Sequence, residues 1–198
     1  MSVLFHGNFG LNRAYMSGIL AAGLQDPKLK DKNLAKPFGY GAPFAARYRS
    51  WLHKCGVAEM GLPFKLTSMG EIVAKKDPEF KTLTTQWFLH HELVTDPVRS
   101  EAWHFFALEF LPKNETFTKD KLLMGIMNKL RSHSEQHFGP GSKLNKTILK
   151  KIIEAYTSDQ GLGQLNLIKS DGDSYIRLNP KSLGPWKTPA AFEKAYSK

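Results

Sequence analysis

Apolar residues recur at intervals of three and four along most of the chain, which is the spacing of one helix face. The stretches with this pattern are residues 11–23, 44–55, 85–93, 99–111, 120–134 and 144–156. Apolar residues also flank two turns, and these predict small β-hairpins over residues 57–66 and 166–178. The expected fold is mostly α with small β-hairpins, arranged as tandem winged-helix-like units around a helical core. The expected domains are residues 1–78, 79–112 and 113–198.

The first predicted domain begins with a helix and continues with a helix-turn-helix arrangement. Asn12 is the N-cap candidate of the first helix, and Gly39-Tyr40-Gly41 predicts the turn that precedes the longest helix. Pro43 suits the first turn of that helix, because its missing N–H has no partner there in any case. The apolar stripe of the helix consists of Phe44, Tyr48, Trp51, Leu52 and Cys55. A stripe of this width predicts burial against a core.

The opposite face of the same helix is cationic and polar. Its residues are Arg47, Arg49, Ser50, His53 and Lys54. Such side chains contact phosphates and guanine edges. We therefore expect this face to dock duplex DNA. A winged helix that binds another protein is the alternative interpretation.

The middle of the chain predicts a packed helical core and no site. Ser68 and Glu71 have the spacing of a capping box and predict a helix start. The helices over 85–93 and 99–111 are rich in Trp and Phe, and Asp96-Pro97 separates them. Aromatic residues at helical spacing favour a core over a surface on which bases stack.

The last predicted domain repeats the order of helices followed by a hairpin. Asp171-Gly172 lies between two short strands, and this dipeptide is typical of a tight hairpin turn. The cationic residues expected to follow DNA phosphates here are Lys146, Lys150, Lys151, Lys169 and Arg177. Thr188-Pro189 predicts the start of a closing helix, which ends without an obvious cap. This ending suggests a chain truncated at its C-terminus.

Metal and catalytic groups are sparse in the sequence. The carboxylates that a magnesium-dependent nickase would use are Asp77, Glu79, Asp171 and Asp173. His133 and His137 are four residues apart, but no third ligand is evident nearby. The side chains of His90 and His91 diverge by about 100° on a helix and cannot share one ion. No phosphate-binding glycine loop, His-Glu-x-x-His motif or serine elbow is present. We therefore expect no metal site or cofactor, with magnesium reserved for the nickase alternative.

The distribution of charge along the chain adds to this interpretation. The 198 residues carry a net charge of +10, of which residues 1–76 contribute +7, residues 77–142 contribute −2 and residues 143–198 contribute +5. The positive charge thus coincides with the two winged-helix-like domains, and this favours DNA over a membrane as the partner. The single cysteine excludes a disulfide framework. With no apolar run of roughly 18 residues and no leader, we expect a cytoplasmic protein.

Several short motifs together resemble a known bacterial family. They are Phe5-His6-Gly7-Asn8-Phe9, Phe38-Gly39-Tyr40-Gly41, Arg47 to Trp51 with Gly56-Val57, Leu66-Thr67 with Gly70 and Asp77-Pro78, Trp87-Phe88-Leu89-His90, and Trp103-His104-Phe105-Phe106. In this order they resemble the uncharacterised domain family encoded beside DNA phosphorothioation (Dnd/Ssp-type) defence genes, which includes the nicking component of Ssp-type systems. The opening of that family usually reads Phe-x-Gly-His-Glu-x-Phe, whereas Asn8 and Phe9 follow Gly7 here. No catalytic residue is therefore carried over.

The resemblance implies a setting in bacterial DNA modification or antiphage defence. Combined with the charge pattern, it leads us to expect a DNA-binding component of such a system, docking duplex DNA through a basic helix-turn-helix. A metal-dependent nickase of the same system and a winged-helix adaptor for proteins are the alternatives. Expected partners are DNA and other proteins of the modification system, and the sequence leaves a homodimer open.

Overall fold

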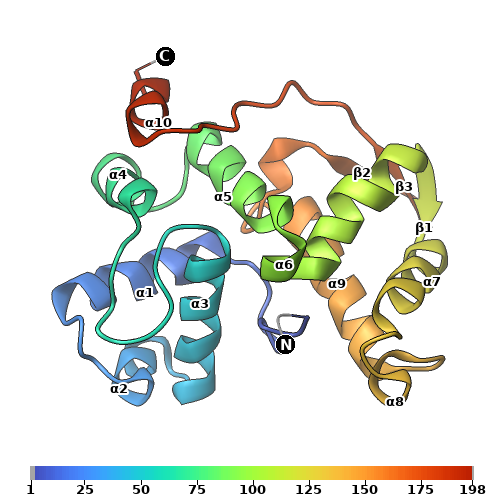
Figure 1. Cartoon of the computed structure of the whole chain (residues 1–198), viewed down its shortest axis with the longest axis horizontal. Coiled ribbons are helices and arrows are strands. Elements are labelled where there is room, and N and C mark those ends of the chain that lie inside the picture. Colours follow the sequence, from blue (N-terminus) through green and yellow to red (C-terminus); the bar gives the residue numbers. More distant parts are fainter. Residues whose placement is uncertain (1–2, 198) are drawn as a thin grey trace. The chain divides into compact units, whose positions relative to one another are not determined.

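The structure is a computed structural model that describes residues 3–197 (Figure 1), and it divides into two compact units. The amino-terminal unit comprises Phe5–Glu92 and residues 182–197. The central unit comprises residues 3–4 and Leu93–Lys181. This division differs from the predicted one, because residues 182–197 pack with the amino-terminal unit although they follow the central unit in the chain.

The amino-terminal unit is built from helices. Its elements are α1 (Arg13–Gln25), α2 (Asp31–Ala35), η1 (Lys36–Phe38), α3 (Ala42–Lys54), α4 (Ser68–Lys76), the part of α5 (Leu83–Thr95) up to Glu92, and α10 (Pro189–Ala195). Asn12 caps α1 as predicted, since its side chain accepts a hydrogen bond from the Tyr15 N–H at 3.1 Å. The hairpin expected over residues 57–66 is reduced to a single β-bridge between Ala58 and Leu66.

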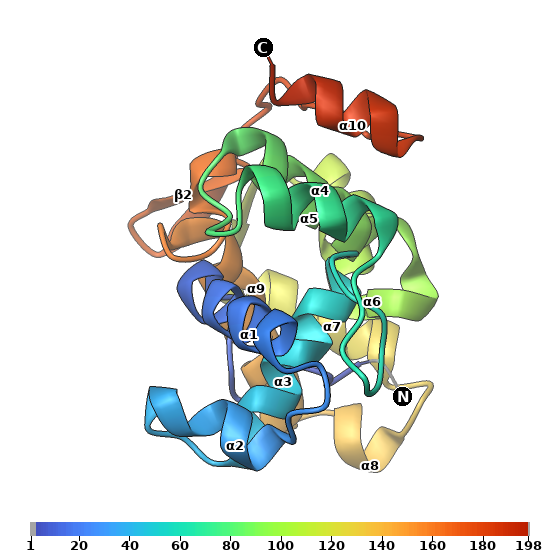
Figure 2. The same ribbon diagram turned by 90° about the vertical axis from the view of Figure 1, so that its left-hand side faces the viewer.

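Helix α3 supplies the centre of this unit. The predicted apolar stripe is confirmed, because Phe44, Tyr48, Trp51, Leu52 and Cys55 are all buried. Figure 2 shows α3 beside α1 and α2, which contact it. The Tyr40 ring stacks on Phe44 with ring centroids 4.4 Å apart, and further rings extend this cluster.

The start of α4 differs from the prediction by one residue. Its N-cap is Thr67 and not Ser68, and Thr67 Oγ1 accepts a hydrogen bond from the Gly70 N–H at 2.9 Å. The same hydroxyl donates to the Gly56 carbonyl at 2.6 Å, a bond that local sequence spacing could not reveal. Gly70 is required at this point, because a Cβ there would lie 1.8 Å from the Val57 carbonyl oxygen.

Helix α10 completes the amino-terminal unit. Phe192 is fully buried, and its ring centroid lies 4.6 Å from that of Phe88. Thr188 is the N-cap of α10, as expected from the Thr188-Pro189 pair.

The central unit combines helices with a small sheet. Its elements are the end of α5, α6 (Pro97–His104), the π-helix η2 (Phe105–Phe110), η3 (Leu111–Lys113), β1 (Thr116–Thr118), α7 (Lys119–Leu130), α8 (Glu135–Phe138), α9 (Lys143–Thr157), η4 (Gly163–Leu165), β2 (Ile168–Asp171) and β3 (Ser174–Arg177). Among the described residues, β1, β3 and β2 form one antiparallel sheet in that order. Phe117 pairs with Tyr175 across β1 and β3, and their rings stack at 5.5 Å.

The prediction of a mostly α fold with a small β-hairpin is confirmed. Strand β1 was not among the predicted elements. Thr118 does cap α7, accepting a hydrogen bond from the Lys121 N–H, but it also ends the strand. The π-helix was not predicted either. It lies where Gly125 of α7 lets the Phe105 ring approach closely, since a Cβ at Gly125 would lie 2.9 Å from that ring. Within residues 3–197, no helix is both long and apolar enough to cross a membrane.

Candidate nucleic-acid interface

The cationic face of α3 is largely engaged within the amino-terminal unit. Arg47 Nη1 donates to the Phe5 carbonyl at 3.0 Å, and a Cβ on Gly7 would lie 3.1 Å from Arg47 Nε. Arg49 Nη1 donates to the Asp31 carboxylate at 2.9 Å, and Arg49 Nη2 donates to the Gly61 carbonyl. The two arginines thus attach the start of this unit, α2 and the loop before α4 to α3.

The remaining predicted residues of α3 also have internal contacts. Ser50 Oγ donates to the Ala46 carbonyl at 3.0 Å, and His53 Nδ1 lies 3.2 Å from the Ala58 carbonyl. Lys54 Nζ lies 5.8 Å from the centre of the Phe5 ring, which is a cation–π distance. The structure therefore brings the five predicted residues together on one helix, where each of them has a contact within the same unit.

Helix α9 of the central unit differs from α3, because several of its cationic side chains are exposed. Lys143, Lys146 and Lys150 are exposed, and their spacing of three and four residues places them on one face of α9. Within residues 3–197, Lys143 and Lys146 form no ion pair, while Lys150 lies 3.7 Å from Glu154. Lys151 points elsewhere, since its side chain is 14% exposed and binds Glu154 at 2.7 Å. Lys143 was not among the predicted site residues, although its spacing from Lys146 and Lys150 was a signal for it.

The two other predicted cations lie on the hairpin after α9, and they differ in their contacts. Lys169 is exposed on β2. Arg177 on β3 is used inside the unit, because its Nη1 donates to the carbonyls of Leu111 and Pro112 at 2.9 and 2.8 Å. Asp171 and Asp173 are exposed at the turn of the hairpin. Within residues 3–197, Lys143, Lys146 and Lys169 are thus exposed cations without an ion pair, as are Lys113, Lys119 and Lys121 near β1 and α7.

The predicted carboxylates do not gather into a metal site. Asp77 is 6% exposed and accepts hydrogen bonds from the Lys81 N–H, the Thr82 N–H and both threonine hydroxyls of Thr82 and Thr85, at 2.6 to 2.9 Å. Glu79 forms an ion pair with Lys81. In the described part of the chain, no three His, Cys, Asp or Glu side chains are placed to hold one ion. The Asp77 carboxylate instead fixes the start of α5.

The histidines that the sequence singled out are engaged within the fold. Helix α7 ends at Leu130, so His133 and His137 do not share a continuous helix. His133 Nε2 lies 2.6 Å from the Glu101 carboxylate. Burial lowers the pKa of His90 to about 3, so this side chain is neutral near pH 7. His91 Nε2 lies 3.1 Å from Ser182 Oγ and 2.9 Å from the Leu183 carbonyl, and so contacts the segment that precedes α10.

This fold defines a mostly α protein in which one unit carries a basic helix followed by a β-hairpin. The chain belongs to the family described as "Protein of unknown function (DUF4007)", which matches residues 6–177. No curated protein matches the sequence.

Two solved structures are similar to the chain in fold: "Magnesium ion-bound SspB crystal structure" and "SspB crystal structure". Each has a TM-score of 0.65 and 15% sequence identity, and covers 91% of this chain. The chain in turn spans 61% of each of them. The resemblance to Ssp-type proteins is therefore confirmed at the level of fold.

Proposed function

We propose that the protein is a DNA-binding component of a bacterial DNA phosphorothioation system, and that it contacts duplex DNA with α9 and the β2–β3 hairpin of the central unit. The observation that carries this proposal is the lysine face of α9, formed by Lys143, Lys146 and Lys150. The family resemblance supplies the setting, and the fold likeness to SspB supports it.

The order of elements supports the choice of α9. Helix α7, a connection that contains α8, and α9 follow one another and a β-hairpin comes next, which is the element order of a helix-turn-helix with a wing. A preceding strand closes the sheet in the order β1-β3-β2. We infer from this order that the central unit is a winged helix. In helix-turn-helix proteins the second helix enters the major groove, and its N-terminal residues contact base edges. Here that end of the helix carries Lys143 and Lys146.

The charge of α9 supports the same surface. Residues 143–153 of α9 contain four lysines and no acidic residue, and Glu154 enters only in its last turn. A lysine that neutralises a phosphate releases a condensed counterion, so each such contact adds to affinity at low salt. Helix α3 is the weaker candidate, because its arginines already bind Asp31 and backbone carbonyls. A nickase gains no support from the carboxylates, since Asp77 is occupied by four donors.

The proposal is tested by measuring affinity for a short fluorescent DNA duplex at 50 and 200 mM salt. A triple variant with Lys143→Gln, Lys146→Gln and Lys150→Gln should bind at least tenfold more weakly at the lower salt. The slope of log affinity against log salt should become shallower by about 3 units or less, roughly 0.9 per lost phosphate contact. The matched control is Lys28→Gln, Lys30→Gln and Lys32→Gln, which removes three exposed charges from the amino-terminal unit.

Equal weakening by the two triple variants would show that net charge, and not α9, determines binding. Binding that is independent of salt would contradict the proposal outright. A supercoiled plasmid incubated with the protein and magnesium, with and without EDTA, separates DNA binding from nicking. We expect no relaxation, and EDTA-sensitive relaxation would favour the nickase.

A further inference from the structure

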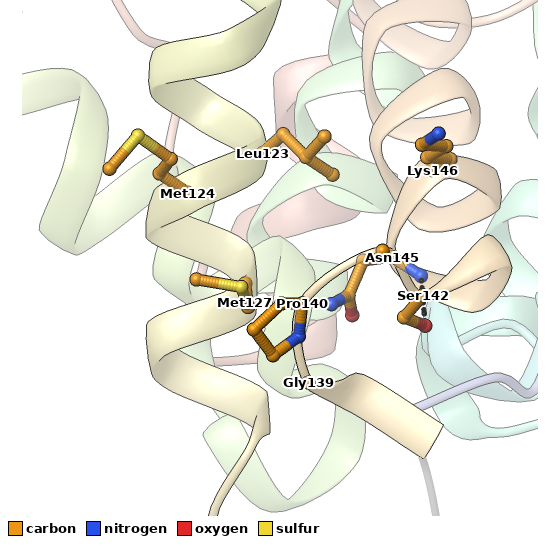
Figure 3. A pocket seen from close by; sticks show the side chains of 9 residues that line it. Leu123, Met124, Met127, Gly139, Pro140, Ser142, Asn145 and Lys146 are labelled. Carbon is orange, nitrogen blue, oxygen red and sulfur yellow. Dashed lines mark hydrogen bonds between the residues drawn. The ribbon is translucent and has the colours of Figure 1, made fainter. Parts of the chain in front are cut away.

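The central unit contains a cavity of about 160 Å³ beside the N-terminus of α9 (Figure 3). It is bounded by α7 on one side and by the turn between α8 and α9 on the other. The residues that line it are Leu123, Met124, Met127, Gly139, Pro140, Gly141, Ser142, Asn145 and Lys146. The cavity is therefore a slot between a wall of aliphatic and thioether side chains and a wall of glycine and proline.

Asn145 gives this slot a polar side chain whose hydrogen-bonding capacity is only partly satisfied. Its side chain is 1% exposed, and Nδ2 donates to the Phe138 carbonyl at 2.6 Å. Its Oδ1 has no hydrogen-bond partner within residues 3–197. In Figure 3 the Asn145 side chain points toward Pro140. A buried acceptor without a donor is costly, so a ligand that brings an N–H group would be stabilised here.

We propose that this slot takes one unpaired nucleobase of the DNA that α9 binds. This inference rests on the proposed function and adds a specific subsite to it. A base is planar and largely apolar on its faces, and it carries N–H donors on its edge. Two features of the slot match these properties, namely its apolar walls and its buried acceptor, and Lys146 adds a cation for the adjoining phosphate.

The size of the slot agrees with one ring. An apolar cavity of about 150 Å³ accommodates benzene, so a cavity of this volume admits a single six-membered ring. Methionine sulfur makes favourable contacts with aromatic rings, which suits Met124 and Met127 as one wall. An aliphatic side chain from a partner protein fits the same walls, but it would leave Asn145 Oδ1 without a donor and Lys146 without an anion.

Access to the acceptor requires a small movement of the turn. Because Nδ2 of Asn145 donates to the Phe138 carbonyl, the side-chain amide of Asn145 lies next to the segment that follows Phe138. That segment is Gly139-Pro140-Gly141, in which Pro140 and Gly141 are exposed and Gly141 has φ of +80°. Outward displacement of this turn uncovers Oδ1 for the base. The N–H of the base then donates to Oδ1 while Nδ2 retains its own acceptor.

Three duplexes of the same sequence test the subsite: one fully paired, one with a single bulged cytosine, and one with an abasic site in place of that cytosine. The abasic duplex keeps the distorted backbone but lacks the base. We expect the protein to bind the cytosine bulge at least fivefold more tightly than the abasic bulge. Met124→Ala with Met127→Ala should reduce this ratio to less than twofold, while affinity for the paired duplex changes by less than twofold. Met60→Ala, at an exposed methionine of the amino-terminal unit, is the control and should keep the full ratio.

Equal affinity for the two bulges overturns the base subsite. If paired DNA is still bound in that case, the proposed function stands, and an apolar side chain of a partner protein becomes the better occupant. Absence of binding to all three duplexes overturns the proposed function itself. Loss of the ratio in the Met60→Ala control would show that the methionine effect is not specific to the slot, and would also overturn the assignment.

Discussion

Arg49 on α3 binds the carboxylate of Asp31 on α2, with Nη1 and Oδ1 separated by 2.9 Å. The Arg49 side chain is 13% exposed and the Asp31 side chain is 29% exposed, so the pair is well shielded from solvent. The second guanidinium nitrogen donates to the Gly61 carbonyl. Arg49 therefore joins three segments of the amino-terminal unit, and this use of the side chain leads to a first prediction.

Arg49→Ala should lower the free energy of unfolding by about 1–3 kcal/mol, because Asp31 and the Gly61 carbonyl lose a charged donor. Affinity for paired DNA should change less than in the α9 triple variant. Urea unfolding followed by tryptophan fluorescence measures the first quantity, and the duplex titration measures the second. Lys32→Ala removes an exposed charge from α2 and should leave stability nearly unchanged. A collapse of DNA affinity with unchanged stability would instead make α3 the interface.

Thr67→Ala should lower the free energy of unfolding by about 1–2 kcal/mol, because α4 loses the acceptor for the Gly70 N–H and the loop loses the bond to Gly56. Ser68→Ala is the matched control, since Ser68 is the first residue of the helix and is exposed. We expect that change to cost less than about 0.5 kcal/mol. Similar losses for the two variants, measured by urea unfolding, would contradict the position of the cap.

Asp77→Asn should lower the free energy of unfolding by roughly 2–4 kcal/mol, because an amide cannot accept the four hydrogen bonds that the carboxylate accepts. Glu79→Gln, two residues away and exposed, should change it by less than about 0.5 kcal/mol. If Asp77 bound a catalytic metal, the substitution would abolish a magnesium-dependent activity while preserving stability. Thermal unfolding of both variants, together with the plasmid assay, decides between these outcomes.

His90 should make the protein less stable in mild acid. Its pKa is about 3 in the folded protein, below the value of about 6.5 in an unfolded chain, because burial disfavours the charged imidazolium. Between these two values the unfolded state binds more protons, so stability is lost as pH falls below about 6.5. From pH 7 to pH 5 this residue should remove about 2 kcal/mol.

The measurement for His90 is urea unfolding at pH 7 and pH 5. His90→Gln should reduce the difference in unfolding free energy between the two pH values, whatever its effect at pH 7. His137→Gln removes an exposed histidine and should leave the difference as it is in the wild-type protein. An unchanged pH difference in His90→Gln would show that His90 does not titrate in this way.

Local periodicity was sufficient to predict the buried stripe of α3 and the extent of α9, because each depends on residues three and four positions apart. The use of the arginines could not be predicted in this way. Arg47 binds Phe5, 42 residues earlier, and Arg49 binds Asp31, 18 residues earlier. Strand β1 is three residues long and pairs with β3 near residue 175, so nothing close to it in sequence marks it as a strand.

The candidate site also combines a feature that local spacing predicts with one that depends on distant contacts. The lysines of α9 could be placed on one face from their spacing alone, whereas the cavity beside them depends on how α7 meets the turn before α9. Arg177 and Asp77 illustrate the limit of charge as a signal. A charged residue in a sequence can serve an interface or the protein's own backbone carbonyls and N–H groups, and only the folded structure distinguishes the two.

The chain passes between its two units after residues 4, 92 and 181, so neither unit is one continuous piece of sequence. A protein shortened after residue 181 would lose Phe192 from the core of the amino-terminal unit while retaining every strand and helix of the central unit. Apolar surface on Phe88 would then be uncovered, and aggregation of the shortened protein would follow from the amino-terminal unit even if DNA binding by α9 survived. Truncation at this apparent domain limit therefore tests solubility and DNA binding as separate properties of the two units.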